Sequence, residues 1–141
     1  MQDNVVIDAS SLVALVLPEQ YSEWVEKQIS EVLYIHAPSL IAYEASNALW
    51  KKHVLLRIID EEKYYNAVRV IEKMLDYIVN IHDYKEFLKK ARDLALKEKI
   101  TIYDASYIAL AIKLKTKLIT LDKKLKNKVS KTLKNIIITP E

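Results

Sequence analysis

At residues 5–11 the chain reads Val5-Val6-Ile7-Asp8-Ala9-Ser10-Ser11, an apolar run that ends in an acid and two hydroxyl side chains. A short β-branched run of this kind predicts a buried strand, and Asp8 then marks its carboxyl end. The run Leu118-Ile119-Thr120-Leu121 ends in Asp122 in the same way. Open α/β sheets place their ligands at the carboxyl ends of strands, so both acids are candidates for a functional site.

Around these two runs, apolar segments of strand length alternate with helical periodicity along the whole chain. The predicted strands cover residues 4–7, 33–36, 77–81, 117–120 and 136–138, and the predicted helices cover residues 10–17, 22–30, 39–56, 60–74, 84–99 and 101–114, with a short lysine-rich helix before the last strand. This alternation predicts one α/β domain over residues 1–141, with a parallel β-sheet flanked by helices. A chain of 141 residues, 51% of them hydrophobic, can bury a core without disulfides or metals.

Two further acids lie on predicted helices that follow strands. Glu44 is in the helix 39–56, and Asn47 lies one turn further along the same face. Asp104 opens the helix 101–114, which is almost wholly apolar. A carboxylate at the head of such a helix loses most of its hydration, which is costly unless a cation or hydrogen-bond donors meet it.

Taken one by one, these acids have structural alternatives. Asp8 or Ser10 could cap the first helix, Asp122 could cap the last, and Thr101 begins a capping box with Asp104. The acid on the helix 39–56 could simply face solvent. Taken together, however, all four acids would converge on one crevice if the sheet is parallel, and independent caps do not require this.

Four converging carboxylates repel one another, and the pKa of at least one would rise unless a divalent cation neutralised the group. Mg²⁺ and Mn²⁺ prefer oxygen ligands, keep several waters and can activate one of those waters as a nucleophile. The leading reaction class is therefore phosphodiester hydrolysis, and the predicted metal-binding and catalytic residues are Asp8, Glu44, Asp104 and Asp122.

The composition excludes several other classes of protein. The chain has no Gly, so it has no glycine-rich phosphate loop, and no Cys, so it has no thiol nucleophile, disulfide or Cys-built zinc site. The three histidines lack the spacing of metal ligands and are expected to be packed or solvated. Turns that need a positive φ would have to use other residues, with the asparagines at positions 80, 127 and 135 as candidates.

The N-terminal segment has no basic region, and its longest early apolar stretch, residues 12–17, is too short for a signal or membrane helix. We therefore expect a cytoplasmic protein with no membrane partner. Charge is unevenly spread: residues 113–134 carry nine lysines and only one acid, Asp122. Such a segment suits the backbone of a nucleic acid, although a solvated helix surface would have the same composition. Because the lysines flank Asp122, the basic surface would lie beside the acids.

Four segments resemble, in order and spacing, the motifs of PIN-domain ribonucleases, and more narrowly those of VapC-type toxins of toxin–antitoxin pairs. They are Val5-Val6-Ile7-Asp8-Ala9-Ser10, Glu44-Ala45-Ser46-Asn47-Ala48-Leu49, Tyr103-Asp104-Ala105-Ser106-Tyr107-Ile108-Ala109-Leu110-Ala111 and Leu118-Ile119-Thr120-Leu121-Asp122-Lys123-Lys124-Leu125. The combination is specific and covers nearly the whole chain. One departure is visible, because the family often has Gly in the turn before the last of these strands, where this chain reads Lys115-Thr116-Lys117.

The resemblance implies a Mg²⁺- or Mn²⁺-dependent endoribonuclease with an RNA substrate, a homodimer, and inhibition by a cognate VapB-like antitoxin. It also implies that Ser10, Asn47 and Thr120 orient the metal-binding acids, whereas Ser10 could merely cap a helix and Asn47 could be an exposed amide. The helices 39–56 and 60–74, with their aromatic residues Trp50, Tyr64 and Tyr65, are the predicted dimer surface unless these aromatics belong to the core.

Four other classes of protein share some of these sequence features. A haloacid-dehalogenase-like phosphatase would use Asp8 as its phospho-acceptor, but it would need a second acid where Ser10 stands. A receiver domain fails because no apolar strand near residues 58–64 ends in an Asp. A housekeeping RNA-processing nuclease and a non-catalytic RNA-binding or interaction module, both with the same fold, stay open as alternatives.

Overall fold

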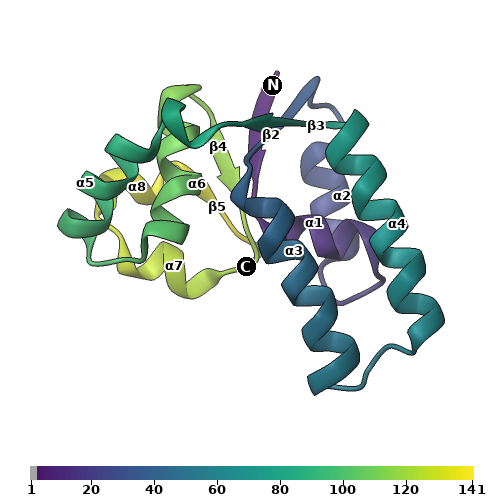
Figure 1. Ribbon diagram of the computed structural model, residues 1–141. Coiled ribbons are helices and arrows are strands. Elements are labelled where there is room, and N and C mark those ends of the chain that lie inside the picture. The colour runs from purple at the N-terminus through teal and green to yellow at the C-terminus, as the bar shows by residue number, and fades with distance from the viewer. Residues whose placement is uncertain (1–2) are drawn as a thin grey trace.

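The computed structural model describes residues 3–141, and its centre is a five-stranded sheet with helices on both faces (Figure 1). The elements follow in the order β1 (Asn4–Ile7), α1 (Ala9–Val16), α2 (Ser22–Ile29), β2 (Tyr34–Pro38), α3 (Leu40–Trp50), the π-helical turn η1 (Lys51–Leu55), α4 (Glu61–Tyr77), β3 (Val79–His82), the 3-10 turn η2 (Tyr84–Glu86), α5 (Leu88–Glu98), α6 (Ile102–Lys113), β4 (Lys117–Ile119), α7 (Lys123–Lys128), α8 (Lys131–Lys134) and β5 (Ile137–Ile138). The predicted α/β fold is confirmed.

The strands lie in the order β3-β2-β1-β4-β5, and every neighbouring pair is parallel. The central strand β1 pairs Val6 with His36 on one side and with Leu118 on the other. The chain adds β2 and β3 on one side of β1, and then β4 and β5 on the other. The order therefore reverses between β1 and β4, and ligands of open α/β sheets bind outside the carboxyl ends at this point.

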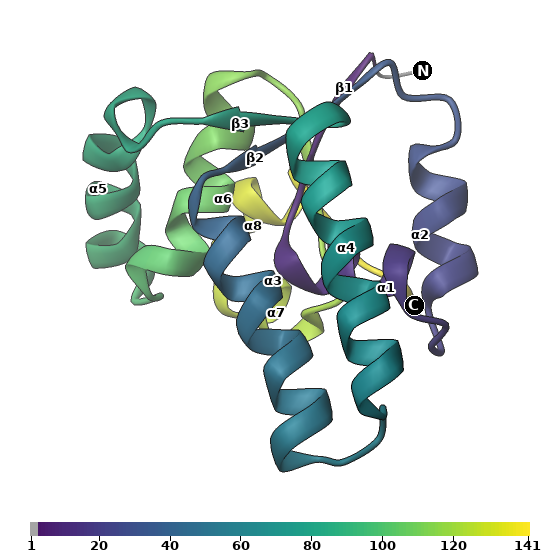
Figure 2. The ribbon, with the colours of Figure 1, turned by 45° about the vertical axis from the view of Figure 1, so that its right-hand side comes forward.

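Helices cover the two faces of the sheet in separate groups. Figure 2 shows α5 and α6 on one side and α1, α3 and α4 on the other. Helix α6 packs against β1, β2 and β4, and its residues from Ala105 to Ala111 are all buried. The strand β1 is buried on both faces, with Val5, Val6 and Ile7 at most 1% exposed. The buried sheet and α6 thus provide a rigid frame for the residues at the strand ends.

The absence of Gly is handled differently from the sequence prediction. The residues with a positive φ within the part of the chain described here are Arg57, Lys99 and Lys115. The asparagines predicted for this role lie in regular structure or have an ordinary φ, namely Asn80 in β3, Asn127 in α7 and Asn135 with φ −69°. That prediction was wrong, because the left-handed position is fixed by where a helix ends, and α5 and α6 end next to lysines.

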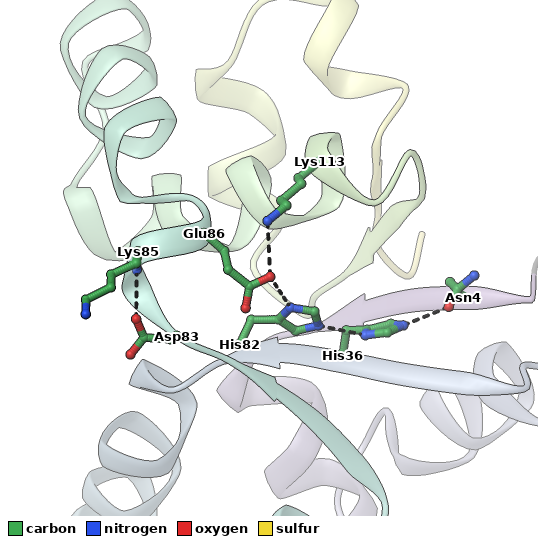
Figure 3. A network of polar contacts seen from close by, with 7 residues as sticks. All are labelled: Asn4, His36, His82, Asp83, Lys85, Glu86 and Lys113. Carbon is green, nitrogen blue, oxygen red and sulfur yellow. Dashed lines mark hydrogen bonds and ion pairs between the residues drawn. The ribbon is translucent and has the colours of Figure 1, made fainter.

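A network of polar side chains ties β1, β2, β3, η2 and α6 together (Figure 3). His36 Nε2 lies 2.7 Å from Asn4 Oδ1, and His36 Nδ1 lies 2.9 Å from His82 Nε2. Glu86 Oε1 receives His82 Nδ1 at 3.0 Å and Lys113 Nζ at 3.1 Å. The hydrogen bond from His82, followed by that from Lys113, lowers the pKa of Glu86 to about 2. Burial, and then the neighbouring His82, lowers the pKa of His36.

Within residues 3–141, none of the helices combines the length and apolar character needed to span a lipid bilayer. The predicted absence of a membrane partner and the predicted cytoplasmic location remain predictions.

Candidate active site

Asp8 stands where β1 ends and α1 begins, and its carboxylate receives three hydrogen bonds. Oδ1 accepts from Ser11 N at 3.0 Å and from Ser10 Oγ at 2.7 Å, and Oδ2 accepts from the Thr120 hydroxyl. The predicted capping role is confirmed, since the bond from Ser11 caps α1. Burial raises the pKa of Asp8, and the hydrogen bonds from Thr120 and Ser10 oppose that rise. The carboxylate is thus fixed in orientation, and no basic side chain among residues 3–141 forms an ion pair with it.

Thr120 and Ser10 connect Asp8 to the segment that follows β4. The Thr120 hydroxyl, which is fully buried, donates to Asp8 and accepts from Asp122 N at 3.0 Å. Ser10 Oγ, which donates to Asp8, accepts from Leu121 N at 3.1 Å. Each hydroxyl therefore joins the two sides of the point where the strand order reverses. Both residues therefore hold Asp8 in place, and their predicted role in orienting metal ligands stays a prediction.

Asp122 is the N-cap of α7, and its Oδ1 accepts from Leu125 N at 3.1 Å. Asp104 lies in the first turn of α6, where Thr101 is the N-cap and its hydroxyl oxygen accepts from Asp104 N at 3.0 Å. The capping prediction for Asp122 is confirmed, and of the predicted capping box the structure shows the bond that Thr101 accepts from Asp104 N. Burial raises the pKa of Asp104, the charge of Asp122 raises it further, and Lys128 opposes the rise. These two acids, far apart in sequence, are electrostatic neighbours.

Glu44 on α3 is half-buried and faces α6. Its Oε1 accepts a 2.6 Å hydrogen bond from the hydroxyl of Tyr107, whose side chain is 3% exposed. Burial raises the pKa of Glu44, and the charges of Asp104 and Asp8 add to that rise, while the hydrogen bond from Tyr107 opposes it. The alternative that Glu44 simply faces solvent is excluded by this contact.

Sequence reasoning assigned no role to Tyr107, although two signals pointed to it. Tyr107 lies three residues after Asp104, so the two side chains share one face of α6. It is also a Tyr within a buried apolar helix, where the hydroxyl has to find a polar partner. The sequence could not identify that partner, because it depends on how α3 packs against α6.

Asn47 lies one turn after Glu44 on α3 and is exposed. Within residues 3–141 its side chain makes no hydrogen bond, in contrast to those of Ser10 and Thr120. Its predicted role in orienting the acids remains a prediction.

The four acids form one electrostatic group at the carboxyl ends of β1 and β4. Within the described chain, none of the four carboxylates lies within ion-pair distance of a Lys, Arg or His side chain. Across residues 3–141, no three Asp, Glu, His or Cys side chains are arranged so that they could hold one metal ion as placed. Mg²⁺, however, is usually bound through one or two carboxylates and several waters. An all-oxygen set of acids, three of which have a raised pKa, has the donor chemistry for such an ion.

The lysine-rich segment reaches this group. Lys128 acts electrostatically on Asp104, and Lys123 lies against Tyr21, with its Nζ 5.3 Å from the ring centre and 3.3 Å from the hydroxyl. Both lysines belong to α7, which begins directly after Asp122. A basic helix therefore stands beside the acids, as the sequence predicted.

Comparisons with known proteins place these features in a family. A model described as PIN domain matches residues 5–130, a range that includes all four acids. Ribonuclease VapC3 of Pyrobaculum aerophilum is 40% identical over 127 residues, covering 89% of this chain and 94% of that protein. Exonuclease VapC9 of the same organism is 32% identical over 120 residues, covering 85% and 81%.

Solved structures have the same fold. The crystal structure of PAE2754 from Pyrobaculum aerophilum matches with a TM-score of 0.67 at 29% identity, covering 95% of this chain and 82% of that one. The structure of VapBC2 from Rickettsia felis, bound to a DNA fragment from their promoter, matches with a TM-score of 0.61 over 98% of this chain and 99% of that one. At 15% identity, the second match shows a common fold alone.

Proposed function

Because the chain belongs to the PIN-domain family, we propose that it is a divalent-metal-dependent endoribonuclease, the toxin of a VapBC-like toxin–antitoxin pair. The observation that carries this proposal is the group of four acids where the strand order reverses. Burial and the charges of neighbouring acids raise the pKa of Glu44 and of Asp104, and no basic side chain of the described residues pairs with either. A divalent cation would neutralise this charge.

In this proposal Asp8, Glu44, Asp104 and Asp122 hold Mg²⁺ or Mn²⁺. The bound ion supplies positive charge that lowers the pKa of a water and offsets the charge developing on the phosphodiester. The protein's own contribution is to fix the acids. Ser10 and Thr120 hold Asp8, and Thr101 fixes the first turn of α6 below Asp104. Fixed ligands keep the reacting groups close and aligned, which lowers the activation barrier.

RNA is a polyanion, and acids alone would repel it. Helix α7 offsets this repulsion, because it carries four lysines and starts at the residue after Asp122. The basic segment from Lys113 to Lys134 would hold the phosphate backbone and present it to the acids. The identity to Ribonuclease VapC3 supports RNA as the substrate.

The test is cleavage of RNA by the purified protein. With Mn²⁺ or Mg²⁺ it should cut single-stranded or looped RNA, and EDTA should stop the reaction. A circular RNA has no ends, so its linearisation distinguishes an endonuclease from an exonuclease. Asp104→Asn should fold and lose activity, and cleavage at the wild-type rate by this variant would reject the assignment of the site.

We further propose a homodimer and a cognate antitoxin as protein partners. Trp50 and Tyr65 on the α3–α4 hairpin are 43% and 52% exposed, so they are available as a contact surface, whereas Tyr64 is partly buried and packs against the core. The fold shared with the VapBC2 complex supports an antitoxin partner, and a basic side chain of the antitoxin would be attracted to the acids. A monomer by light scattering at micromolar concentration would contradict the dimer. A small upstream open reading frame whose product binds this protein and inhibits it is the result expected for the toxin.

A further inference from the structure

Tyr107 joins the two helices that carry Glu44 and Asp104. Its ring is packed in the core at 3% exposure, and its hydroxyl donates to Glu44 Oε1 at 2.6 Å. Helix α6 therefore presents an acid and, one turn later on the same face, the residue that holds a second acid. The hydroxyl proton of Tyr107 already makes this hydrogen bond, so it needs no water as an acceptor.

Glu44 needs such a contact because its own neighbours push it away. The charges of Asp104 and Asp8 both disfavour its ionised form. A glutamate side chain has three rotatable bonds and gains entropy by turning to solvent. With repulsion and entropy acting in the same direction, an unheld carboxylate on α3 would leave the site. The hydrogen bond from Tyr107 is the contact that opposes this movement.

A phenol differs here from a lysine or an arginine. Burial, and then the hydrogen bond to Glu44, raises the pKa of Tyr107, so the hydroxyl keeps its proton and stays a donor. It holds the carboxylate without adding a positive charge. Glu86 shows the other solution, since Lys113 and His82 occupy one of its oxygens and a positively charged side chain already neutralises it.

We propose that Tyr107 is a positioning residue of the cation site, whose hydroxyl holds Glu44 Oε1 and so keeps this carboxylate where it would bind a divalent ion. This inference rests on the proposed function. Residues that hydrogen-bond to a metal ligand generally fix the orientation of that ligand, and mutating such a residue typically weakens metal binding about 10–100-fold. Tyr107 would have this role toward Glu44.

The test is Mn²⁺ binding by isothermal titration calorimetry to the full chain without RNA. Tyr107→Phe removes one oxygen atom and keeps the packed ring, and we expect its Kd for Mn²⁺ to rise about 10–100-fold. Tyr77→Phe is the matched control, because Tyr77 is 85% exposed at the end of α4 and should bind like the wild type. Equal affinity of Tyr107→Phe and wild type would overturn the inference.

A double-mutant cycle separates positioning from a general loss of stability. If Tyr107 acts through Glu44, then adding Tyr107→Phe to Glu44→Ala, which has no acceptor for the hydroxyl, should weaken Mn²⁺ binding much less than it does in the wild-type background. Equal weakening in both backgrounds would show that the tyrosine acts through packing and would reject the role. Absence of Mn²⁺ binding to the wild type is a different outcome, because it rejects the cation site of the proposed function itself.

A measurement on the wild type guards against a variant that does not fold. The NMR signals of the Tyr107 hydroxyl proton and ring protons should shift when Mg²⁺ is added. The signals of Tyr77 should not change. Signals of Tyr107 that do not move at saturating Mg²⁺ would reject the contact between this residue and the cation site.

Discussion

Each end of helix α6 contributes to a cluster of ionisable side chains, and the two clusters shift the pKa of a carboxylate in opposite directions. At its last residue, Lys113 and the nearby His82 meet Glu86, and the pKa of this acid falls to about 2. In its first turn, Asp104 lies among other acids, and burial and Asp122 raise its pKa. The first cluster, the histidine network of Figure 3, is neutralised within the chain. In the part of the chain that the structure describes, the acid site has no basic side chain paired with it, which is why we assign a cation to it.

The largest expected difference between the clusters is in catalysis. Asp8→Asn keeps the shape of the side chain but removes a charge from the cation site, and RNA cleavage should fall by more than about 10²-fold. Glu86→Gln removes a carboxylate of the histidine network and should cleave at nearly the wild-type rate. Initial rates on one RNA under identical Mn²⁺ measure both. Equal losses in the two variants would break the distinction between the clusters.

The next effect concerns the residues that orient Asp8. Thr120→Val has the same shape as Thr but cannot donate to Asp8 or accept from Asp122 N. We expect about 10–100-fold weaker Mn²⁺ binding, because the hydrogen bond orients a ligand. Thr132→Val in the exposed part of α8 is the control and should bind as the wild type does. If Thr120→Val binds Mn²⁺ with unchanged affinity, the Thr120 hydroxyl contributes to the fold and not to the cation site.

The two clusters should also respond to pH with opposite sign. Because the pKa of Glu86 is lowered, its stabilisation is present above about pH 4.5 and is lost as the pH falls toward about 2. Glu86→Gln should therefore be less stable than wild type at pH 7, by about 0.5 kcal/mol for a partly exposed ion pair, and the difference should shrink on acidification. Urea unfolding at pH 7, 5 and 3.5 measures it, and a constant difference would contradict the assignment.

For Asp104 the sign is reversed, because its pKa is raised from 3.8. Its charge costs stability once the pH rises through the raised value, and the cost is absent below about pH 3.8. Without metal, Asp104→Asn should thus be more stable than wild type at pH 7, with a difference that disappears in acid. The dipole of α6 favours an acid in this turn by about 0.3–1 kcal/mol. A less stable variant would mean that this term outweighs burial and repulsion.

The smallest effect is expected at His36, whose pKa burial and His82 lower from 6.5. The imidazole of His36 then binds a proton more weakly in the folded protein than in the unfolded chain. The free energy of unfolding is therefore not reduced by His36 above about pH 6.5, and it falls as the pH decreases below that value. His36→Asn should remove this part of the pH dependence between pH 7.5 and 5.5 in metal-free protein. The same slope in both proteins would contradict it.

The sequence was sufficient where local pattern decides structure. The apolar run that ends in Asp8 correctly predicted the strand β1 and the cap of α1, and Thr101 correctly predicted the start of α6. It was insufficient where distant elements meet. Tyr107 finds Glu44 only through the packing of α6 on α3, and His36 meets His82 only because β2 and β3 pair in one register. Spacing along the chain carries no signal for such contacts.

The distinction between a neutralised and an unneutralised cluster is tested most directly by thermal melting with EDTA and with millimolar Mn²⁺. At a hundredfold excess over Kd, binding to the native state adds about 2.7 kcal/mol, which should raise the Tm of the wild type by about 5–10 °C. Asp8→Asn and Asp104→Asn should lose most of this rise, and Glu86→Gln should keep it. If the wild type melts at the same temperature in EDTA and in Mn²⁺, the acids do not form a cation site.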